Sequence, residues 1–452
     1  MSFPKDFVWG AAAASYQIEG AASEDGRGLS VWDMMCRWPD KVWSGNTGDV
    51  GCNHYHRYEA DARMMGEIGL QAYRLSISWS RVLPEGIGAV NEKGLEFYDR
   101  LIDALLENGV DPWVTLFHWD YPYALYCKGG WLHPESPDWF AEYAGVIVDK
   151  LSDRVTHWMT QNEPQCYLGL GHVTGEHAPG LKLGQADFLL ATHHSHLAHG
   201  KAVQVIRARA KATPCVGAAP VGVIRSPLHD TKENIEAARK VTFSVSANDF
   251  WNNTWYADPM VLGQYPEDGL ELFKEDMPEI KNGDMETICQ PLDFYGANIY
   301  HSRPVGVGAD GDVFDPPVPD GPALTMMDWP VSPEGLYWGP RFLYERYRLP
   351  IVVTENGMAN ADWIHVDGKV HDPQRIDYAT RYLREYHRAI SEGVPAQGYF
   401  HWSLMDNFEW ALGYKKRFGV VFVDYETGER TLKDSAHWYR EVIKSHGGSL
   451  LA

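Results

Sequence analysis

Short apolar segments alternate with helical patterns along most of the chain. Eight segments have the length and the aliphatic and aromatic content of buried strands, near residues 8–13, 72–79, 112–119, 156–163, 216–223, 292–300, 351–355 and 396–403. Between them, segments such as 91–109, 137–154, 372–393 and 432–447 carry apolar residues at helical spacing. This alternation predicts a parallel sheet with helical crossovers, and eight such units predict a (β/α)8 barrel.

Residues at the ends of these segments refine the prediction. Gly109 is expected to cap the end of one helix, and Asp372, followed by Pro373, to cap the start of another. Residues 304–322 are rich in Pro and Gly and predict a long surface loop. No segment of the chain has the composition of a linker between domains. We therefore expect an α/β chain that folds, over residues 1–452, as a single (β/α)8 TIM barrel with elaborated loops after its strands.

Uncommon polar and aromatic residues stand at the carboxyl ends of the predicted strands. Three apolar residues in segment 351–355 lead to Glu355, although an ionised carboxylate taken out of water is costly unless it is paired or hydrogen-bonded. Other strand ends carry His118, Trp119, Asn162, Glu163, Asn298, Tyr300 and Trp402. Barrels of this kind form their active sites at that edge. Two carboxylates facing each other across a cleft, here Glu163 and Glu355, are typical of glycoside hydrolysis.

Composition excludes several other classes of function. The formal net charge of −21 argues against nucleic acids and anionic membranes as partners, because both require basic surface. The six Cys residues show no CxxC motif, which favours free thiols in a reducing compartment, and we expect a cytoplasmic protein. No apolar stretch approaches the length of a membrane span. The 18 Trp residues would suit a groove lined by indole rings, as well as a large core.

Six motifs follow one another along the chain: FVWGAAAASYQIEGA (7–21), YRLSISWSR (73–81), LFHWDYP (116–122), TQNEP (160–164), IVVTENG (351–357) and WSLMDNFEWALGY (402–414). In this order they closely resemble glycoside hydrolase family 1, the retaining β-glucosidase family. The resemblance extends from Phe7 to about Trp438. It implies hydrolysis of terminal β-D-glucosyl residues from small-molecule β-glucosides by double displacement. We expect no cofactor and no metal, and the resemblance leaves open whether the protein forms a homo-oligomer.

The resemblance also implies a role for each matching residue. Glu355 would be the nucleophile and Glu163 the general acid/base, while Arg74 and Tyr300 would contact Glu355 and keep it ionised. A carboxyl group without such a partner, as expected for Glu163, should have a raised pKa and stay protonated. Asn162 would bind the sugar 2-hydroxyl. The other residues expected to bind or enclose the substrate are Gln17, His118, Trp119, Asn298, Tyr300, Trp329, Trp402, Glu409, Trp410 and Phe418.

Two alternatives remain at this point. A 6-phospho-β-glucosidase would carry Ser in place of Glu409, followed by a Lys and a Tyr that bind the phosphate. Here Lys415, Lys416 and Arg417 follow Glu409, and we interpret them most simply as a solvated basic run. Phe418 stands where the Tyr would. A sugar-binding barrel without catalysis would be expected to lack one of the two glutamates.

Some features near the motifs call for a plainer interpretation. The histidines of ATHHSHLAHG, namely His193, His194, His196 and His199, are interpreted as packed or solvated rather than as metal ligands. Cys166 is interpreted as a small wall residue. The chain departs from the family pattern at Gln165, often Trp, and at Tyr123, commonly Gln, both on the presumed leaving-group side.

Overall fold

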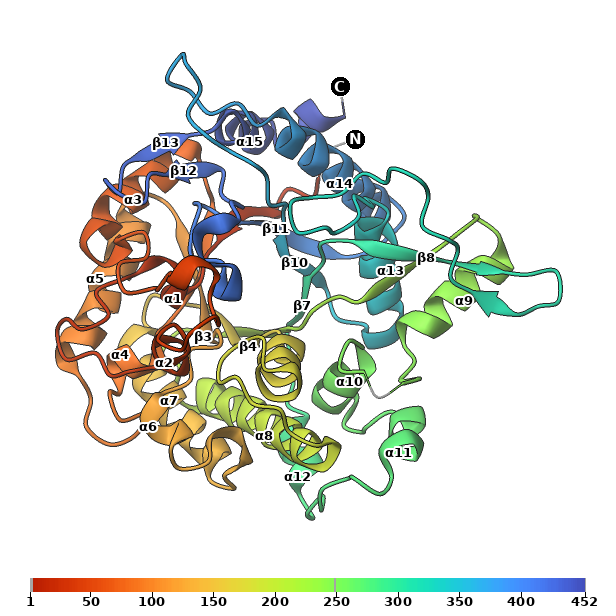
Figure 1. Ribbon diagram of the computed structural model, residues 1–452, viewed down its shortest axis with the longest axis horizontal. Coiled ribbons are helices and arrows are strands. Elements are labelled where there is room, and N and C mark those ends of the chain that lie inside the picture. The colour runs from red at the N-terminus through yellow and green to blue at the C-terminus, as the bar shows by residue number, and fades with distance from the viewer. Residues whose placement is uncertain (1–2, 248, 452) are drawn as a thin grey trace.

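Eight parallel strands close into a barrel at the centre of the molecule (Figure 1). The structure is a computed structural model that describes residues 3–247 and 249–451. In order around the barrel the strands are β1 (Val8–Ala12), β2 (Ala72–Ser76), β3 (Asp111–Phe117), β4 (His157–Asn162), β5 (Cys215–Ala219), β7 (Phe294–Asn298), β10 (Ile351–Asn356) and β11 (Ala396–Trp402). The predicted fold class is confirmed.

Burial explains why these segments are strands. Strand β10 pairs in parallel with β7 on one side and β11 on the other. Its apolar residues Ile351, Val352 and Val353 are all fully buried, because one face of the strand meets the barrel interior and the other meets the helical layer. The backbone groups of the strand are satisfied by the neighbouring strands.

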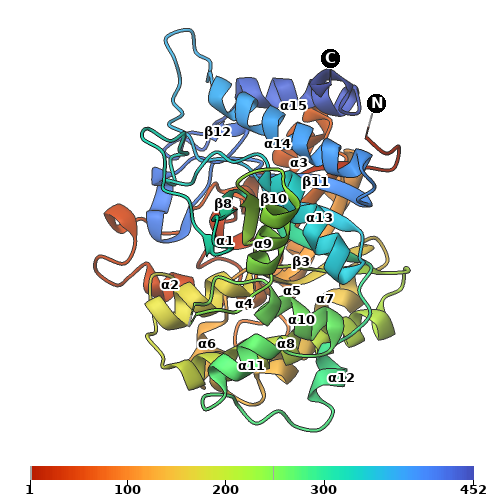
Figure 2. The same ribbon diagram turned by 90° about the vertical axis from the view of Figure 1, so that its right-hand side faces the viewer.

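Helices surround the barrel, as the two perpendicular views show (Figures 1 and 2). The long ones are α3 (His54–Ile68), α5 (Glu92–Glu107), α7 (Ser136–Leu151), α8 (Gln185–Arg209), α9 (Lys232–Thr242), α10 (Thr254–Leu262), α13 (Gly335–Tyr347), α14 (Pro373–Ser391) and α15 (Asp434–Lys444). Helix α5 buries Leu95, Leu101 and Leu105 on one stripe, as predicted. Gly109 follows its end with φ of 73°, a left-handed conformation that Gly adopts without steric cost.

Shorter elements fill the loops between strands and helices. They are α1 (Ser15–Ile18), α2 (Val31–Met35), α4 (Trp79–Val82), α6 (Tyr123–Tyr126), α11 (Glu267–Phe273), α12 (Asp284–Ile288), η1 (Trp43–Gly45), η2 (Gly130–Leu132), the π-helix η3 (Gln165–Thr174), η4 (Trp410–Lys415) and η5 (Gly448–Leu450). Small sheets are formed by β6 (Ile224–Pro227), β8 (Ser302–Val307) and β9 (Val313–Phe314), and by β12 (Val421–Val423) with β13 (Arg430–Leu432).

Several local predictions were wrong. The second barrel strand was expected to reach residue 79 but ends at Ser76, and Trp79 begins helix α4. The fifth barrel strand stops at Ala219 instead of continuing to residue 223, since Pro220 has no N–H to donate to the sheet. Residues 304–322 are not loop throughout, because they contain the end of β8 and the whole of β9. Asp372 does precede α14, but its side chain makes no cap hydrogen bond and instead accepts from Arg375 and from Ser435.

A helix that crosses a membrane needs about 20 predominantly apolar residues. Within residues 3–247 and 249–451, none is both long and apolar enough to cross a bilayer.

Candidate active site

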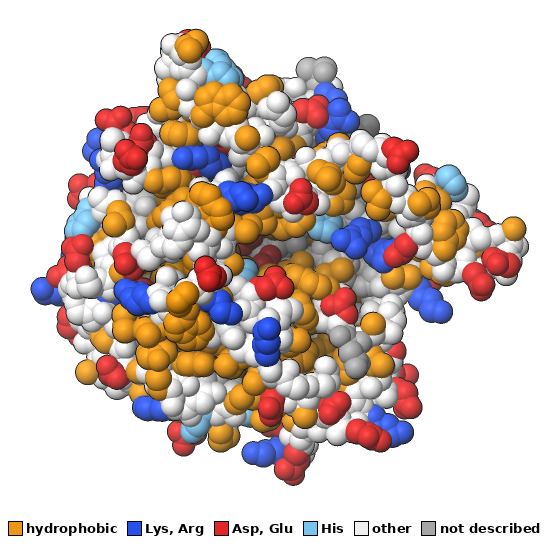
Figure 3. All heavy atoms as spheres, in the orientation of Figure 1, with side chains coloured by type: hydrophobic (Ala, Val, Ile, Leu, Met, Phe, Trp, Pro, Cys, Tyr) orange, Lys and Arg blue, Asp and Glu red, His pale blue; other side chains and the backbone are white. Residues whose placement is uncertain are grey.

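The predicted site residues gather at the carboxyl ends of the barrel strands. Arg74 lies in β2, Asn162 ends β4, Asn298 ends β7, Glu355 lies in β10 and Trp402 ends β11. The others come from the segments that follow: Gln17 from α1, His118 and Trp119 after β3, Glu163 after β4, Tyr300 and Trp329 between β7 and α13, and Glu409, Trp410 and Phe418 after β11. One face of the molecule is hollowed near its centre, with acidic and histidine side chains visible inside the hollow (Figure 3).

Glu355 is held by two donors. Arg74 Nη1 donates to Glu355 Oε1 at 2.5 Å, and the Tyr300 hydroxyl donates to Oε2 at 2.6 Å. Both Arg74 and Glu355 are almost completely buried, so the ion pair is little screened by water. The expected contacts of Arg74 and Tyr300 with the Glu355 carboxylate are therefore present.

Glu163 has donors of a different kind. Asn298 Nδ2 donates to Glu163 Oε1 at 2.9 Å, and the Cys166 thiol donates to Oε2 at 3.2 Å. Glu163 was expected to lack a partner, which is wrong, but neither donor carries a charge. Cys166 reaches the Glu163 carboxyl group because η3 begins at Gln165, only two residues after Glu163, and Cys166 lies in its first turn. Among the described residues no group accepts a hydrogen bond from the Glu163 carboxyl group. When this group is protonated, its proton is therefore free to bond to a substrate.

Three side chains, Arg74, Asn162 and Asn298, connect the two glutamates. Arg74 Nη2 donates to Asn162 Oδ1 at 2.5 Å while its other nitrogen holds Glu355. Asn298 Nδ2 donates both to that same Asn162 oxygen, at 3.0 Å, and to Glu163. Thr354 donates to Asn298 Oδ1 at 2.6 Å and fixes the direction of its amide. One hydrogen-bonded chain thus positions both carboxyl groups.

The surroundings separate the acidities of the two glutamates. Burial, followed by the charge of Glu355, raises the pKa of Glu163 to about 8. Burial also raises the pKa of Glu355, but Arg74 and Tyr300 oppose it there. The effect of Arg74 and Tyr300, which favour the ionised form, is smaller than that of burial, so the pKa of Glu355 is raised on balance. Glu355 is still the group that ionises first, since its donors favour the charged form.

Aromatic rings enclose the space beside Asn162. Asn162 Nδ2 donates to His118 Nε2 at 3.1 Å, and Trp119 Nε1 donates to the Asn162 carbonyl at 2.9 Å. The His118 ring is stacked near Trp402, at 5.8 Å, and near Trp410, at 5.9 Å. Burial and the Arg74 charge lower the pKa of His118 well below its usual value, so the ring is neutral and Nε2 can accept from Asn162.

Three of these residues have unusual backbone conformations. Trp119, Glu163 and Trp410 have φ angles of 79°, 46° and 50°. Residues with side chains seldom occupy this left-handed region, and such strain is often concentrated at functional sites.

Gln17 and Glu409 form a separate polar pair. Gln17 Nε2 donates to Asn407 Oδ1 at 3.0 Å, to the Phe408 carbonyl at 2.8 Å and to Glu409 Oε2 at 3.5 Å. Gln17 Oε1 is buried without a hydrogen-bond partner among the described residues, and so it is an acceptor available to a ligand. Burial, with the charges of Glu355 and Glu163, raises the pKa of Glu409 to about 8.

Trp329 completes the opposite wall. Its ring lies 5.1 Å from that of Tyr300 and 6.2 Å from that of Phe418. Because Tyr300 donates to Glu355, this wall stands on the Glu355 side.

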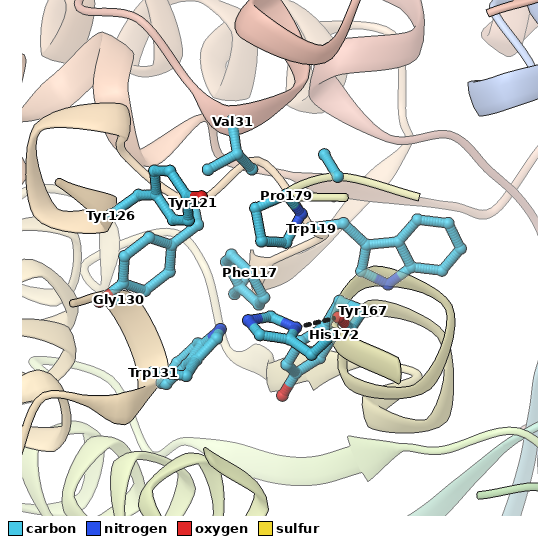
Figure 4. A pocket seen from close by; sticks show the side chains of 11 residues that line it. Val31, Phe117, Trp119, Tyr121, Tyr126, Gly130, Trp131, Tyr167, His172 and Pro179 are labelled. Carbon is cyan, nitrogen blue, oxygen red and sulfur yellow. Dashed lines mark hydrogen bonds between the residues drawn. The ribbon is translucent and has the colours of Figure 1, made fainter. Parts of the chain in front are cut away.

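A small enclosed cavity of about 10 Å³ lies behind Trp119 (Figure 4). Its lining is almost wholly aromatic and apolar and includes Phe117, Trp131, Tyr167 and Pro179, with one hydrogen bond from His172 Nδ1 to the Tyr167 carbonyl. This is room for about one water molecule. The lining includes neither glutamate, so the cavity belongs to the packing behind the site.

Some assignments around the site need correction. Cys166 is more than a wall residue, because its thiol contacts Glu163; the i, i+3 spacing after Glu163 was a signal for this. Arg417 is not part of a solvated run, since it is largely buried and pairs with Asp406 at 2.7 Å. The α8 histidines are packed rather than solvated: His193 and His196 bond to Tyr265, and His199 to Thr160. Within the described residues no group of three or more His, Cys, Asp or Glu could hold a metal ion.

Comparison with known proteins identifies the family. The sequence model of glycosyl hydrolase family 1 matches residues 1–448. β-Glucosidase A of Thermotoga maritima is 44% identical over 451 residues, 98% of both chains, and β-glucosidase A of Acetivibrio thermocellus is 45% identical over 460 residues, 99% of both chains. The solved family 1 β-glucosidase from Thermotoga maritima aligns with a TM-score of 0.90 over 99% of both chains, at 44% identity. The chain belongs to glycosyl hydrolase family 1 and is a glycosidase.

Proposed function

We propose that the protein is a retaining β-glucosidase that removes terminal, non-reducing β-D-glucosyl residues from cello-oligosaccharides or from aryl and alkyl glucosides. The observation that carries this proposal is the pair of buried glutamates with different donors. Glu355 is bound to a cation and a phenol, and Glu163 to an amide and a thiol. The names of the relatives agree, since they are called β-glucosidases.

The first half of the reaction forms a covalent intermediate. A Glu355 oxygen attacks the anomeric carbon while the bond from that carbon to the leaving oxygen breaks, and Glu163 gives its proton to the leaving oxygen. Arg74 and Tyr300 hold the Glu355 carboxylate in line for the attack. Asn162, fixed by Arg74 and Asn298, offers its amide to the sugar 2-hydroxyl, a contact that strengthens in the transition state.

The second half releases glucose. Glu163, now ionised, takes a proton from water while the water oxygen attacks the anomeric carbon and Glu355 departs as a carboxylate. The loss of a nearby charge explains why Glu163 changes from an acid to a base. Once Glu355 is an ester its negative charge is gone, and that charge is one of the causes of the raised pKa of Glu163. The pKa of Glu163 therefore falls in the intermediate, which suits a base.

The Gln17–Glu409 pair supports glucosides over their 6-phosphates. The two oxygens of Glu409 can bond to two sugar hydroxyls at once, and its ionised form, which gains weight as the pH approaches its pKa of about 8, repels a phosphate. Of the three cations behind it, Arg417 is engaged with Asp406, and Lys416 donates to the Met326 carbonyl. Lys415 is exposed and lies over the ring of Trp43, so within the described residues Glu409 has no free cationic cluster of the kind that a phosphate site requires.

The stereochemistry of hydrolysis tests the proposal. In NMR spectra of p-nitrophenyl β-glucoside hydrolysis, the β-anomer of glucose should appear first and the α-anomer only later by mutarotation. Appearance of the α-anomer first would show inversion and would rule out Glu355 as a nucleophile. A structure should also place the two carboxyl groups about 5–5.5 Å apart, as retaining enzymes require.

A further inference from the structure

Gln165 stands at a position where the family often has Trp, on the presumed leaving-group side. Its side chain is fully buried, and both ends of its amide are bonded to backbone. Nε2 donates to the carbonyls of Val221, at 3.3 Å, and Asn252, at 3.1 Å, and Oε1 accepts from the N–H of Val221 at 3.2 Å. Gln165 therefore cannot offer a surface to a substrate, but it holds the segment around Asn252.

The backbone on both sides of Trp251 is fixed by side chains. Asp249 Oδ1 accepts from the N–H of Trp251 at 2.9 Å, and Asn252 Nδ2 donates to the Asp249 carbonyl at 3.1 Å. Asn253 Nδ2 donates to the carbonyls of Val223 and Thr242, at 2.8 and 2.7 Å. A segment held by this many bonds presents its exposed side chain in one place, which lowers the entropy cost of binding through it.

This segment lies against the helix that follows the general acid. Phe250 packs on Gly169 of η3 so closely that a Cβ added at Gly169 would come within 2.0 Å of the ring. The same helix carries Cys166, whose thiol contacts Glu163.

Trp251 itself is a large apolar ring that remains 39% exposed. It lies 5.0 Å from the Phe250 ring, at an angle of 44°, so Phe250 supports it from the η3 side. An indole that is supported on one side and open on the other is suited to stack on a flat apolar surface, such as an aryl ring or the face of a pyranose.

We propose that Trp251 gives this enzyme an additional stacking surface for the leaving group on the Glu163 side, where Gln165 offers none, besides the ring of Trp329 on the opposite wall. The general acid protonates the leaving oxygen, so the leaving group must lie on the Glu163 side, which is where η3 places this segment. The ligand class is an aryl ring or a second glucosyl unit. The inference rests on the proposed function, because it requires Glu163 to be the acid.

Substrates with and without a ring in the leaving group separate this role from a structural one. We would compare wild type, Trp251→Ala and Trp251→Phe on β-glucosyl fluoride, p-nitrophenyl β-glucoside and cellobiose. Trp251→Ala should raise KM for cellobiose and the aryl glucoside about tenfold. The loss should be much smaller for the fluoride, whose leaving group cannot stack, and Trp251→Phe should recover most of the affinity.

Gln165→Ala provides an independent check. If Gln165 acts only by holding the segment of Trp251, the Gln165→Ala variant should raise KM for cellobiose. The double variant, with Gln165→Ala and Trp251→Ala, should then have a KM no higher than that of Trp251→Ala alone. Trp363→Ala is the matched control, since Trp363 is an exposed tryptophan on the loop after β10; it should leave all three substrates unaffected.

Two outcomes would overturn the inference. One is an equal loss on the fluoride and on cellobiose for Trp251→Ala, which would indicate a folding effect. The other is an unchanged KM for cellobiose. Failure of the proposed function looks different, because wild type itself would then hydrolyse none of the three substrates or would release the α-anomer of glucose first.

Discussion

Glu163 and Glu355 are the same residue type, both buried, and they differ in what donates to them. A guanidinium and a phenol favour the charged form of Glu355, whereas an amide and a thiol support Glu163 without supplying a full charge. In a low-dielectric site this difference decides which carboxyl group loses its proton first. In the proposed mechanism, one residue type thus serves as nucleophile and as acid.

The pH dependence follows from that order. Activity requires Glu355 ionised and Glu163 protonated, so the rate should fall at low pH as Glu355 gains a proton. It should fall at high pH as Glu163 loses its proton, near its pKa of about 8. The two groups interact, so the apparent values of the bell-shaped profile belong to the pair. A profile of kcat/KM against pH that stays flat from acid to alkaline, with chemistry limiting, would contradict the scheme.

Cys166 should tune the basic limb of that profile. Its S–H bond favours the ionised form of Glu163, so Cys166→Ala should raise the pKa of Glu163 and move the basic limb to higher pH, by less than about one unit. Cys166→Ser retains a donor and should shift it less. Cys215→Ala, at a half-buried cysteine in β5, is the control and should not shift it. A basic limb unchanged in Cys166→Ala would show that the thiol contact is unimportant.

At the scale of elements, the segment after β11 carries Glu409, Trp410 and Phe418, which we propose bind the glucosyl unit. Asp406 anchors this segment, because its carboxylate accepts hydrogen bonds from Arg417 and from Lys433, both at 2.7 Å. Asn407 and the Phe408 carbonyl accept from Gln17, and this joins the segment to α1. Glu409 is therefore presented by a rigid loop rather than a mobile one.

Glu409→Ser tests the specificity of that loop. The variant should lose roughly 1.5–3 kcal/mol of transition-state stabilisation on p-nitrophenyl β-glucoside, the worth of hydrogen bonds to a charged group. Its bias against the 6-phosphate should become smaller, because the repelling carboxylate is gone. The measurement is kcat/KM for both substrates in both proteins. A wild type that prefers the 6-phosphate by tenfold or more would contradict the glucosidase proposal.

The elements were more predictable than their side-chain partners. The strand of Ile351, Val352 and Val353 is visible in the sequence because three adjacent apolar residues are needed for a strand buried on both faces. The burial of Arg417 was not visible, since it depends on Asp406 and on the rings of Phe422 and Tyr425, which only the fold brings near. The contact of Cys166 likewise depends on the π-helical path of η3.

At the scale of the molecule, a buried charge network ties the last part of the barrel together. Three acids and three bases alternate within it: Asp362, Asp372, Asp406, Arg375, Arg417 and Lys433. They come from the loop after β10, from α14, from the segment after β11 and from the residue before α15. Formal charges cancel, which buried ions require if the folded state is to tolerate them.

Removing one charge should therefore be costly. Lys433→Met leaves Asp362 and Asp406 without a shared cation, and it should lower the free energy of unfolding by about 3–5 kcal/mol. Denaturant unfolding monitored by tryptophan fluorescence gives this value. The control is Arg381→Ala, which breaks an exposed i, i+4 pair with Asp377 and should cost less than about 1 kcal/mol. Equal stability of Lys433→Met and wild type would show that the network contributes little.

The stereochemistry of azide rescue tests the roles of the two glutamates most directly. In Glu163→Ala, azide should attack the glycosyl-enzyme and yield the β-glucosyl azide. In Glu355→Gly, which should be inactive alone, azide should replace the nucleophile and yield the α-glucosyl azide from an activated β-glucoside. The products are distinguished by the NMR coupling of the anomeric proton. The reverse pattern, α from Glu163→Ala and β from Glu355→Gly, would contradict the account, since it would assign the nucleophile to Glu163.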